Sequence, residues 1–192
     1  MSNKKKIAIL ASGNGTNAQR IIEHFTQHPQ IEVACVIYNR KTAKVAQRAQ
    51  TLNIPAIYFN KKDFLETNKV VDYLQQNNID YIILAGFLLL VPQNILELYP
   101  NKILNIHPSL LPKHGGFGMY GDIVHQEVID QKEKESGITI HIVNEQYDRG
   151  DIVFQAKCEV LPQDTPDSLA QRIHQLEHKY FPEVIESFIL KH

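Results

Sequence analysis

The stretch "KIAILASGNGTNAQ", residues 6–19, passes from a short apolar run through a glycine turn into a helical pattern. The apolar run is rich in residues that favour buried strands. Gly13 and Gly15 free the backbone for a tight turn, after which the N–H groups of Gly15, Thr16 and Asn17 open a helix. A strand that leads into a helix in this way indicates an α/β fold.

The same alternation of strand and helix patterns continues to residue 107. Short apolar runs are predicted as strands at 6–10, 31–38, 55–59, 81–86 and 103–107. Segments with apolar residues at helical spacing separate them, at 18–27, 41–52, 61–76 and 92–99. This pattern predicts a mostly parallel central sheet with helices on both faces.

The pattern changes after residue 120. Two apolar segments, 136–143 and 151–160, are separated only by "NEQYDRG", so we expect neighbouring antiparallel strands. A final helix is predicted over 165–190. Its expected start is capped by Thr165 or Asp167, and we expect it to bend or restart at Pro182.

The composition predicts one soluble, cytoplasmic domain over residues 1–192. Hydrophobic residues at 43% and charged residues at 21% are typical of a globular protein, and a formal net charge of -1 argues against a nucleic acid or membrane partner. No run approaches the roughly 20 apolar residues that span a bilayer, and the first apolar run is too short for a signal peptide. Cys35 and Cys158 lack metal-ligand spacing, so we expect buried free thiols.

The glycine loop, residues 13–17, is open to three interpretations. Its backbone N–H groups, with the helix dipole behind them, would suit a phosphate monoester. It also satisfies the loose dinucleotide pattern G-x-G-x-x-A, although "YNRK" at 38–41 supplies no acidic residue for a ribose. The third interpretation is a purely structural turn.

Polar residues end the fifth predicted strand, in "ILNIHPSLLP" at 103–112. Asn105 and His107 alternate with Ile106, so both polar side chains should point to one face while Ile106 faces the core. Pro108 then ends the strand. Because ligands of open α/β sheets bind at the carboxyl ends of the strands, this amide and this imidazole predict a functional site.

Several stretches of the chain match one known family: "SGNGTN", "LAGFLLLVP", "ILNIHPSLLP", "GITIHIVNEQYDRGDIVFQ" and "LEHKYFPEVI". On these stretches the chain resembles the folate-dependent formyltransferases over essentially its whole length. The "SGNGTN" loop is similar to the phosphate cradle of the branch that acts on glycinamide ribonucleotide. The resemblance implies a single Rossmann-like domain, with residues 1–100 as the phosphate- and ribonucleotide-binding half and residues 101–192 as the catalytic and folate-binding half. We expect a monomer or weak homodimer.

The resemblance implies transfer of the formyl group of 10-formyltetrahydrofolate, a co-substrate, to the amine of phosphoribosylglycinamide in purine biosynthesis. No metal and no covalent enzyme intermediate are expected. Asn105 would donate a hydrogen bond to the formyl oxygen as charge develops there. A protonated His107 would stabilise the same charge and protonate the leaving folate nitrogen. Asp148 would orient the imidazole and raise its pKa.

The resemblance also implies two binding sites for small molecules. The ribonucleotide site would consist of Gly13, Asn14, Gly15, Thr16, Asn17, Gly86 and Glu177. The folate site would consist of Leu88, Leu89, Leu90, Val91, Asn105, Val143, Asn144, Glu145 and Tyr147, and the backbone groups of Leu88, Leu90 and Val91 would read the pterin edge. His141, which alternates with apolar neighbours on a strand, is interpreted as support for the site.

The sequence departs from the family at three places. Leu89 stands where several relatives have an arginine. No clear counterpart exists for an arginine that contacts the folate tail, and Lys61 or Lys62 is expected to replace it. The segment "KHGGFGMYGDIVH" differs from the family flap; its glycines predict a mobile flap, and we assign His114 and His125 no role.

Three other functions remain to be weighed. A nucleotide-sugar N-formyltransferase would share Asn105, His107 and Asp148. An NADP-dependent oxidoreductase would use "GNGTNA" and Arg40, and a phosphate-ligand sensor would use the glycine loop alone. An oxidoreductase would not explain Asn105, His107 and Asp148, and a sensor would not use them.

Overall fold

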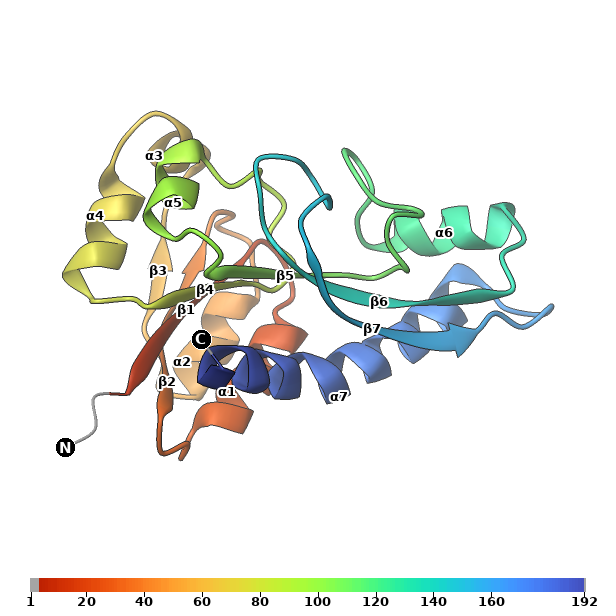
Figure 1. Cartoon of the computed structure of the whole chain (residues 1–192), viewed down its shortest axis with the longest axis horizontal. Coiled ribbons are helices and arrows are strands. Elements are labelled where there is room, and N and C mark those ends of the chain that lie inside the picture. The colour runs from red at the N-terminus through yellow and green to blue at the C-terminus, as the bar shows by residue number, and fades with distance from the viewer. Residues whose placement is uncertain (1–3, 192) are drawn as a thin grey trace.

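A seven-stranded mixed sheet forms the centre of the protein in the computed structural model, which describes residues 4–191 (Figure 1). The strands lie in the order β3–β2–β1–β4–β5–β6–β7. Their bounds are β1 Lys5–Ala11, β2 Ile31–Tyr38, β3 Ala56–Tyr58, β4 Tyr81–Leu84, β5 Ile103–His107, β6 Glu135–Ile142 and β7 Ile152–Glu159. Strands β1 to β5 pair in parallel, whereas β6 and β7 continue the sheet in antiparallel pairing. The predicted parallel sheet and antiparallel C-terminal pair are both confirmed.

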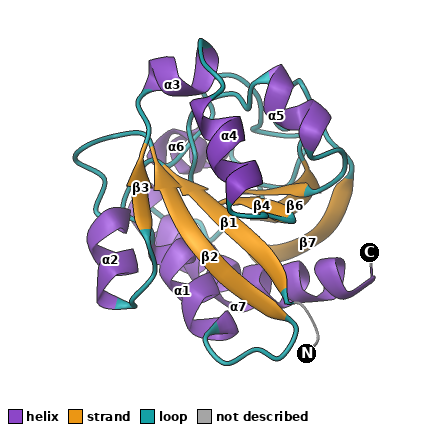
Figure 2. Ribbon diagram, turned by 90° about the vertical axis from the view of Figure 1, so that its left-hand side faces the viewer, coloured by secondary structure: helices purple, strands orange, loops and turns teal. Residues whose placement is uncertain are grey.

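Helices cover both faces of the parallel part of the sheet (Figure 2). One face carries α1 (Thr16–Phe25), α2 (Val45–Thr51) and α7 (Pro166–Lys191), and the other carries α3 (Lys61–Leu65), α4 (Lys69–Gln76) and α5 (Gln93–Leu98). Strand β1 shows why the sheet is covered on both sides. Ile7 and Ile9 are buried in one core cluster, and Ala8 and Leu10 are buried in the other. Such a strand needs a nearly continuous apolar sequence.

The helix predicted over 61–76 is in fact two helices. Asn60 caps α3 through a reciprocal pair of hydrogen bonds with Asp63, which places that carboxylate at the start of the helix. The same carboxylate accepts a hydrogen bond from Lys69 Nζ at 2.9 Å, at the first residue of α4. Strand β3 is one residue shorter than predicted at each end, and β4 ends two residues earlier than predicted.

Helix α6, Asp122–Asp130, was not predicted. It begins directly after Gly121, at the end of the glycine-rich segment that was interpreted as a mobile flap. Its buried residues Val124 and Val128 are one turn apart, and the helix packs against α7. A helix of nine residues with so short an apolar stripe is hard to separate from its glycine-rich surroundings by periodicity.

Helix α7 begins with a hydrogen-bonded cap at Thr165. Thr165 Oγ1 accepts from the Ser168 N–H at 3.2 Å, and Ser168 Oγ accepts from the Thr165 N–H at 3.0 Å. Asp167 lies in the first turn rather than at the cap. The helix does not restart at Pro182, which is buried within it together with Phe181. Packing of this face offsets the backbone hydrogen bond that a proline removes.

The two cysteines differ in burial. Cys35 is fully buried, and burial raises the pKa of its thiol to about 11. Cys158 is only half-buried, beside Arg172, so the expectation of two buried thiols is wrong for this residue. Both are free thiols. Within residues 4–191, no helix combines the length and apolar character required to cross a membrane.

Candidate active site

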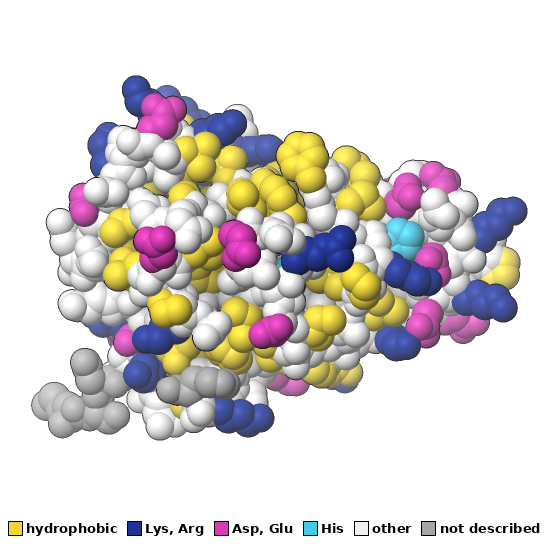
Figure 3. Space-filling view, turned by 45° about the horizontal axis from the view of Figure 1, so that its top comes forward, with side chains coloured by type: hydrophobic (Ala, Val, Ile, Leu, Met, Phe, Trp, Pro, Cys, Tyr) yellow, Lys and Arg dark blue, Asp and Glu magenta, His cyan; other side chains and the backbone are white. Residues whose placement is uncertain are grey.

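A cleft of about 580 Å³ opens over β5 and β6. Its walls come from the loop after β4, the segment 116–121, the β6–β7 loop and the helices α6 and α7. Figure 3 shows the molecule with the top of Figure 1 brought toward the viewer. Apolar side chains gather along the middle of this face, and basic side chains lie among them. The cleft therefore combines an apolar wall with polar groups on its floor.

Most of the predicted site residues line this cleft. They are Asn17, Gly86, Leu88, Leu89, Leu90, Val91, Asn105, His107, Val143, Asn144, Tyr147, Asp148 and Glu177. Gly13, Asn14, Gly15, Thr16 and Glu145 lie outside its lining. Glu145 is exposed because the β6–β7 loop turns its neighbour Gln146 to the cleft instead.

The floor of the cleft is built by β5. Asn105 and His107 line the cleft. Ile106 between them also borders it, but it is buried in the core cluster that contains Leu104. The predicted alternation is therefore confirmed. Within residues 4–191, no set of three His, Cys, Asp or Glu side chains is placed to hold a metal ion.

His107 is almost fully buried and is held at both ring nitrogens. Nε2 donates to the backbone oxygen of His114 at 2.8 Å, and Nδ1 lies 3.4 Å from Asp148 Oδ2. Both neighbours are oxygen acceptors, so the protonated ring satisfies both contacts at once. Burial lowers the pKa of His107 below its ordinary value, although the Asp148 carboxylate opposes this shift. Asp148 thus acts on the pKa in the expected direction, but burial outweighs its charge and sets the net shift.

Asp148 joins the elements that meet at the floor. Its Oδ2 accepts from the Gly116 N–H at 2.9 Å, and its Oδ1 lies 3.5 Å from Asn105 Nδ2 and 3.6 Å from His141 Nε2. Burial raises the pKa of Asp148, but hydrogen bonding to His141, the charge of His107 and the Gly116 N–H outweigh it, so the pKa lies below its ordinary value. Asp148 therefore remains a carboxylate at neutral pH, and its contacts reach well beyond a local turn.

Asn105 is oriented by its cross-strand partner, His141. Asn105 Nδ2 lies 3.0 Å from His141 Nε2, and His141 Nδ1 lies 3.0 Å from the backbone oxygen of Ile142. Because that carbonyl oxygen can only accept, Nδ1 donates to it, and Nε2 faces both the Asn105 amide and the Asp148 carboxylate. The supporting position predicted for His141 matches this geometry.

The glycine loop places the start of α1 beside α2. Gly15 precedes the helix with φ 78, and a Cβ there would collide with Val45. Val45 N donates to Gly13 O at 3.2 Å. The first-turn N–H groups of α1 have no partner within the helix itself, as at any helix start.

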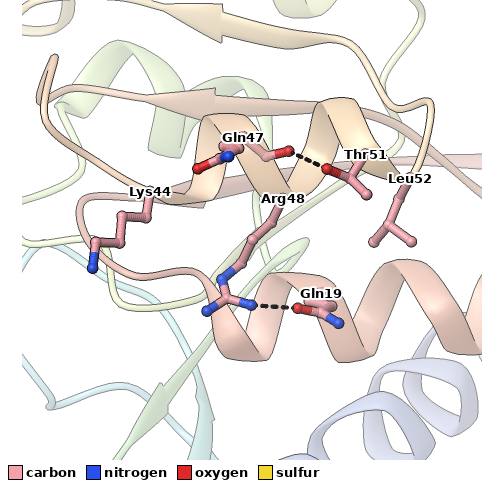
Figure 4. Close-up of a pocket in the computed structure, with 6 residues that line it drawn as sticks. All are labelled: Gln19, Lys44, Gln47, Arg48, Thr51 and Leu52. Carbon is pink, nitrogen blue, oxygen red and sulfur yellow. Dashed lines mark hydrogen bonds between the residues drawn. The ribbon is translucent and has the colours of Figure 1, made fainter.

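Arg48 ties the glycine loop to both helices. Its Nε donates to the backbone oxygen of Asn14 at 2.8 Å and its NH2 to Asn14 Oδ1 at 3.1 Å. Its NH1 donates to Gln19 Oε1 at 2.6 Å, which Figure 4 shows across a smaller pocket between α1 and α2. The loop conformation therefore depends on a residue outside the predicted site.

Ser12 connects the loops after β1 and β4. Its backbone N–H donates to Gly86 O at 2.9 Å, and its Oγ accepts from the Leu88 N–H at 3.0 Å. The Leu88 N–H is thus engaged within the protein. The backbone group of Leu88 that can read a ligand is therefore its carbonyl.

Glu177 on α7 is buried rather than solvated. Its Oε2 accepts a hydrogen bond from Asn17 Nδ2 at 2.9 Å, which joins α7 to the start of α1. Burial raises the pKa of the Glu177 carboxyl, and the Asn17 bond partly opposes that shift. Asn17 Oδ1 is buried without a partner. Both side chains line the cleft and keep hydrogen-bonding capacity toward it.

Several residues that line the cleft were missed. They are Phe117, Met119, Tyr120, Gln146 and His174, and His125 had been given no role. Arg40, which closely follows the carboxyl end of β2, had been considered only for an oxidoreductase. The first three lie in the glycine-rich segment, Gln146 lies in the β6–β7 loop, and the two histidines lie on helices whose facing side the sequence does not reveal. Lys61 and Lys62 lie outside the lining.

Comparison with known proteins agrees with this geometry. The model of the family described as "Formyl transferase" matches residues 5–185. A phosphoribosylglycinamide formyltransferase of Haemophilus influenzae is 40% identical over 190 residues, covering 96% of this chain and 87% of the relative. The chloroplastic phosphoribosylglycinamide formyltransferase of Arabidopsis thaliana is 39% identical over 95% of this chain, which spans 64% of that relative's length. The crystal structure of the Bacillus halodurans phosphoribosylglycinamide formyltransferase has a TM-score of 0.87 at 34% identity, covering 96% of this chain and 95% of that one. The chain therefore belongs to the formyl transferase family.

Proposed function

We propose that the protein transfers the formyl group of 10-formyltetrahydrofolate to the amine of phosphoribosylglycinamide, giving the N-formyl product and tetrahydrofolate in purine biosynthesis. The observation that carries this proposal is the cluster of Asn105, His107 and Asp148 on the floor of a cleft in a formyl transferase chain. The named relatives of that family support the choice of substrates.

The first step is attack of the substrate amine on the formyl carbon. A bond forms between the amine nitrogen and that carbon while negative charge develops on the formyl oxygen. The longer contact of Asn105 Nδ2, 3.5 Å from Asp148 Oδ1, can give way to a hydrogen bond to this oxygen. Such a donor typically contributes about 3–4 kcal/mol to the transition state.

The second step breaks the bond between the formyl carbon and the folate nitrogen. The attacking amine must lose a proton, and the leaving nitrogen must gain one. The resting His107 ring has a lowered pKa and lies beside the Asp148 carboxylate, so this pair can take the amine proton and return one to the leaving nitrogen. Asp148 stabilises the imidazolium that exists between the two transfers.

The two substrates occupy opposite sides of this floor. The phosphate lies at the start of α1, a helix of ten residues whose dipole and free N–H groups favour an anion. The ribose hydroxyls bond to Glu177, which Asn17 orients. The folate ring lies against 86–91 and 143–147, the segments that supply the apolar wall.

A direct assay tests this function. Purified protein is mixed with 10-formyltetrahydrofolate and one candidate amine at a time, and conversion of the folate is followed by absorbance. We expect conversion with phosphoribosylglycinamide and none without an amine. Conversion with a nucleotide-linked amino sugar alone would overturn the substrate assignment.

We further infer that the enzyme works in the cytoplasm as a monomer or weak homodimer. The free thiols of Cys35 and Cys158 are typical of a reducing compartment. Size-exclusion chromatography over a range of protein concentrations tests the assembly state.

A further inference from the structure

His125 is a buried histidine in the cleft wall that the proposed reaction does not use. Its side chain lies on α6 and is 2% exposed, yet it lines the cleft. Its Nδ1 is sealed from solvent without a hydrogen-bond partner, and no residue among 4–191 bonds to its Nε2. Buried polar side chains are nearly always paired. Because Nδ1 is sealed, Nε2 is the ring nitrogen that can pair with a ligand in the cleft.

The ring lines the cleft near groups of both the floor and α7. Helix α6 packs against α7, and the titratable neighbours that act on His125 are His174 on α7, Asp122 on α6 and His107 on β5. The proposed reaction places the substrate amine at His107 and the ribose at Glu177 on α7. A ligand that spans these two positions passes His125.

The chemistry of the ring selects the kind of group that it can bind. Burial, together with the nearby His174 and His107, lowers the pKa of His125 to about 4, against the opposing effect of Asp122. The ring is therefore neutral at physiological pH, with one donor and one acceptor nitrogen. A phosphate prefers a cation, whereas an amide or a hydroxyl pairs well with a neutral imidazole.

We propose that His125 hydrogen-bonds the neutral glycinamide linkage of the ribonucleotide and thereby distinguishes this substrate from other sugar phosphates. This assignment rests on the proposed function, because the linkage is the part of that substrate between the amine and the ribose. His125 binds the substrate without entering the proton transfers.

The test compares two ligands by isothermal titration calorimetry, phosphoribosylglycinamide and ribose 5-phosphate, which lacks the linkage. We expect His125→Phe to weaken binding of the ribonucleotide by about tenfold, the loss of one hydrogen bond, and to leave ribose 5-phosphate within about twofold. His125→Gln, which keeps a polar atom near Nε2, should recover part of the affinity. Formyl transfer by the same variants should show a raised KM for the ribonucleotide with kcat nearly unchanged.

His178→Phe is the matched control. Like His125, His178 has a ring nitrogen without a partner, in this case Nε2. It lies on α7, is partly buried, and lies outside the cleft lining. We expect its substitution to leave the affinities for both ligands unchanged. Thermal melting of each variant shows whether it is folded, and His125→Leu replaces the Phe variant if the larger ring does not fit.

Equal weakening of both ligands by the folded His125 variants, or weakening of neither, would overturn the assignment. A wild-type protein that forms product from phosphoribosylglycinamide while the His125 variants bind it normally would overturn this contact alone. A wild-type protein that neither binds nor formylates phosphoribosylglycinamide would overturn the proposed function, and the contact with it.

Discussion

The floor of the cleft and its α6–α7 wall satisfy their polar groups in different ways. On the floor, His107 has an oxygen beside each ring nitrogen, and Asp148 interacts through both of its oxygens. On the wall, His125 Nδ1 is buried with no partner, and so is Asn17 Oδ1 on the neighbouring start of α1. The difference indicates a division of labour: the protein itself fixes the groups that act in the reaction, while the groups that recognise substrate keep their hydrogen-bonding capacity for it.

Substitutions on the floor should have the largest effect on turnover. We expect Asn105→Ala and His107→Ala each to lower kcat by at least about a hundredfold, because each removes a group that acts on the developing charge or on the protons. The KM of either substrate should change little. Steady-state kinetics measures both, and near-normal kcat in either variant would remove that residue from the reaction.

Asp148→Asn tests whether the carboxylate takes part in the reaction or only stabilises its own loop. The substitution keeps the shape but removes the charge, so we expect kcat to fall by roughly tenfold to a hundredfold while the melting temperature stays near that of the wild type. The pKa of His107, already lowered by burial, should fall further because the opposing negative charge is lost. NMR titration of the ring measures this shift. Normal kcat with a lowered melting temperature would return Asp148 to a structural role.

Arg48→Met should have the smallest effect, confined to the phosphate end. Loss of the Arg48 bonds to Asn14 should loosen the glycine loop and raise the KM for the ribonucleotide by about threefold, with kcat and the folate KM unchanged. This variant isolates the loop better than a β-branched residue at Gly15, which would also strain the backbone and press on Val45. An equal rise in both KM values would contradict a local effect.

The parallel part of the sheet could be predicted because its strands are strongly apolar and alternate with clear helix patterns. Strands buried on both faces need an almost continuous apolar sequence, as in 6–10 and 31–38. Few other secondary-structure elements need such a sequence. Helix α6 could not be predicted in this way. Its two buried valines follow a glycine-rich segment, so the local pattern favours a loop.

The floor of the site could be predicted more completely than its walls. Alternation along one strand places Asn105 and His107 on the same face, and the resemblance supplies Asp148. The contribution of His125 and His174 depends on how distant segments pack, which local sequence does not encode. Burial also decided the sign of the His107 pKa shift, because desolvation depends on the whole surrounding structure.

The hydrogen bond from Gly116 to Asp148 has a further consequence for the motions of the enzyme. This bond links the glycine-rich segment to the β6–β7 loop, and the His107 bond to the His114 carbonyl links the same segment to β5. Neither connection belongs to a regular ladder, so the two loops hold each other closed. If one loop opens, the other loses a hydrogen-bond partner. Asn105, His107 and Asp148 therefore come together or separate in one cooperative step. Folding of the chain therefore already orders these loops. Substrate binding then has to offset less loss of loop conformational entropy.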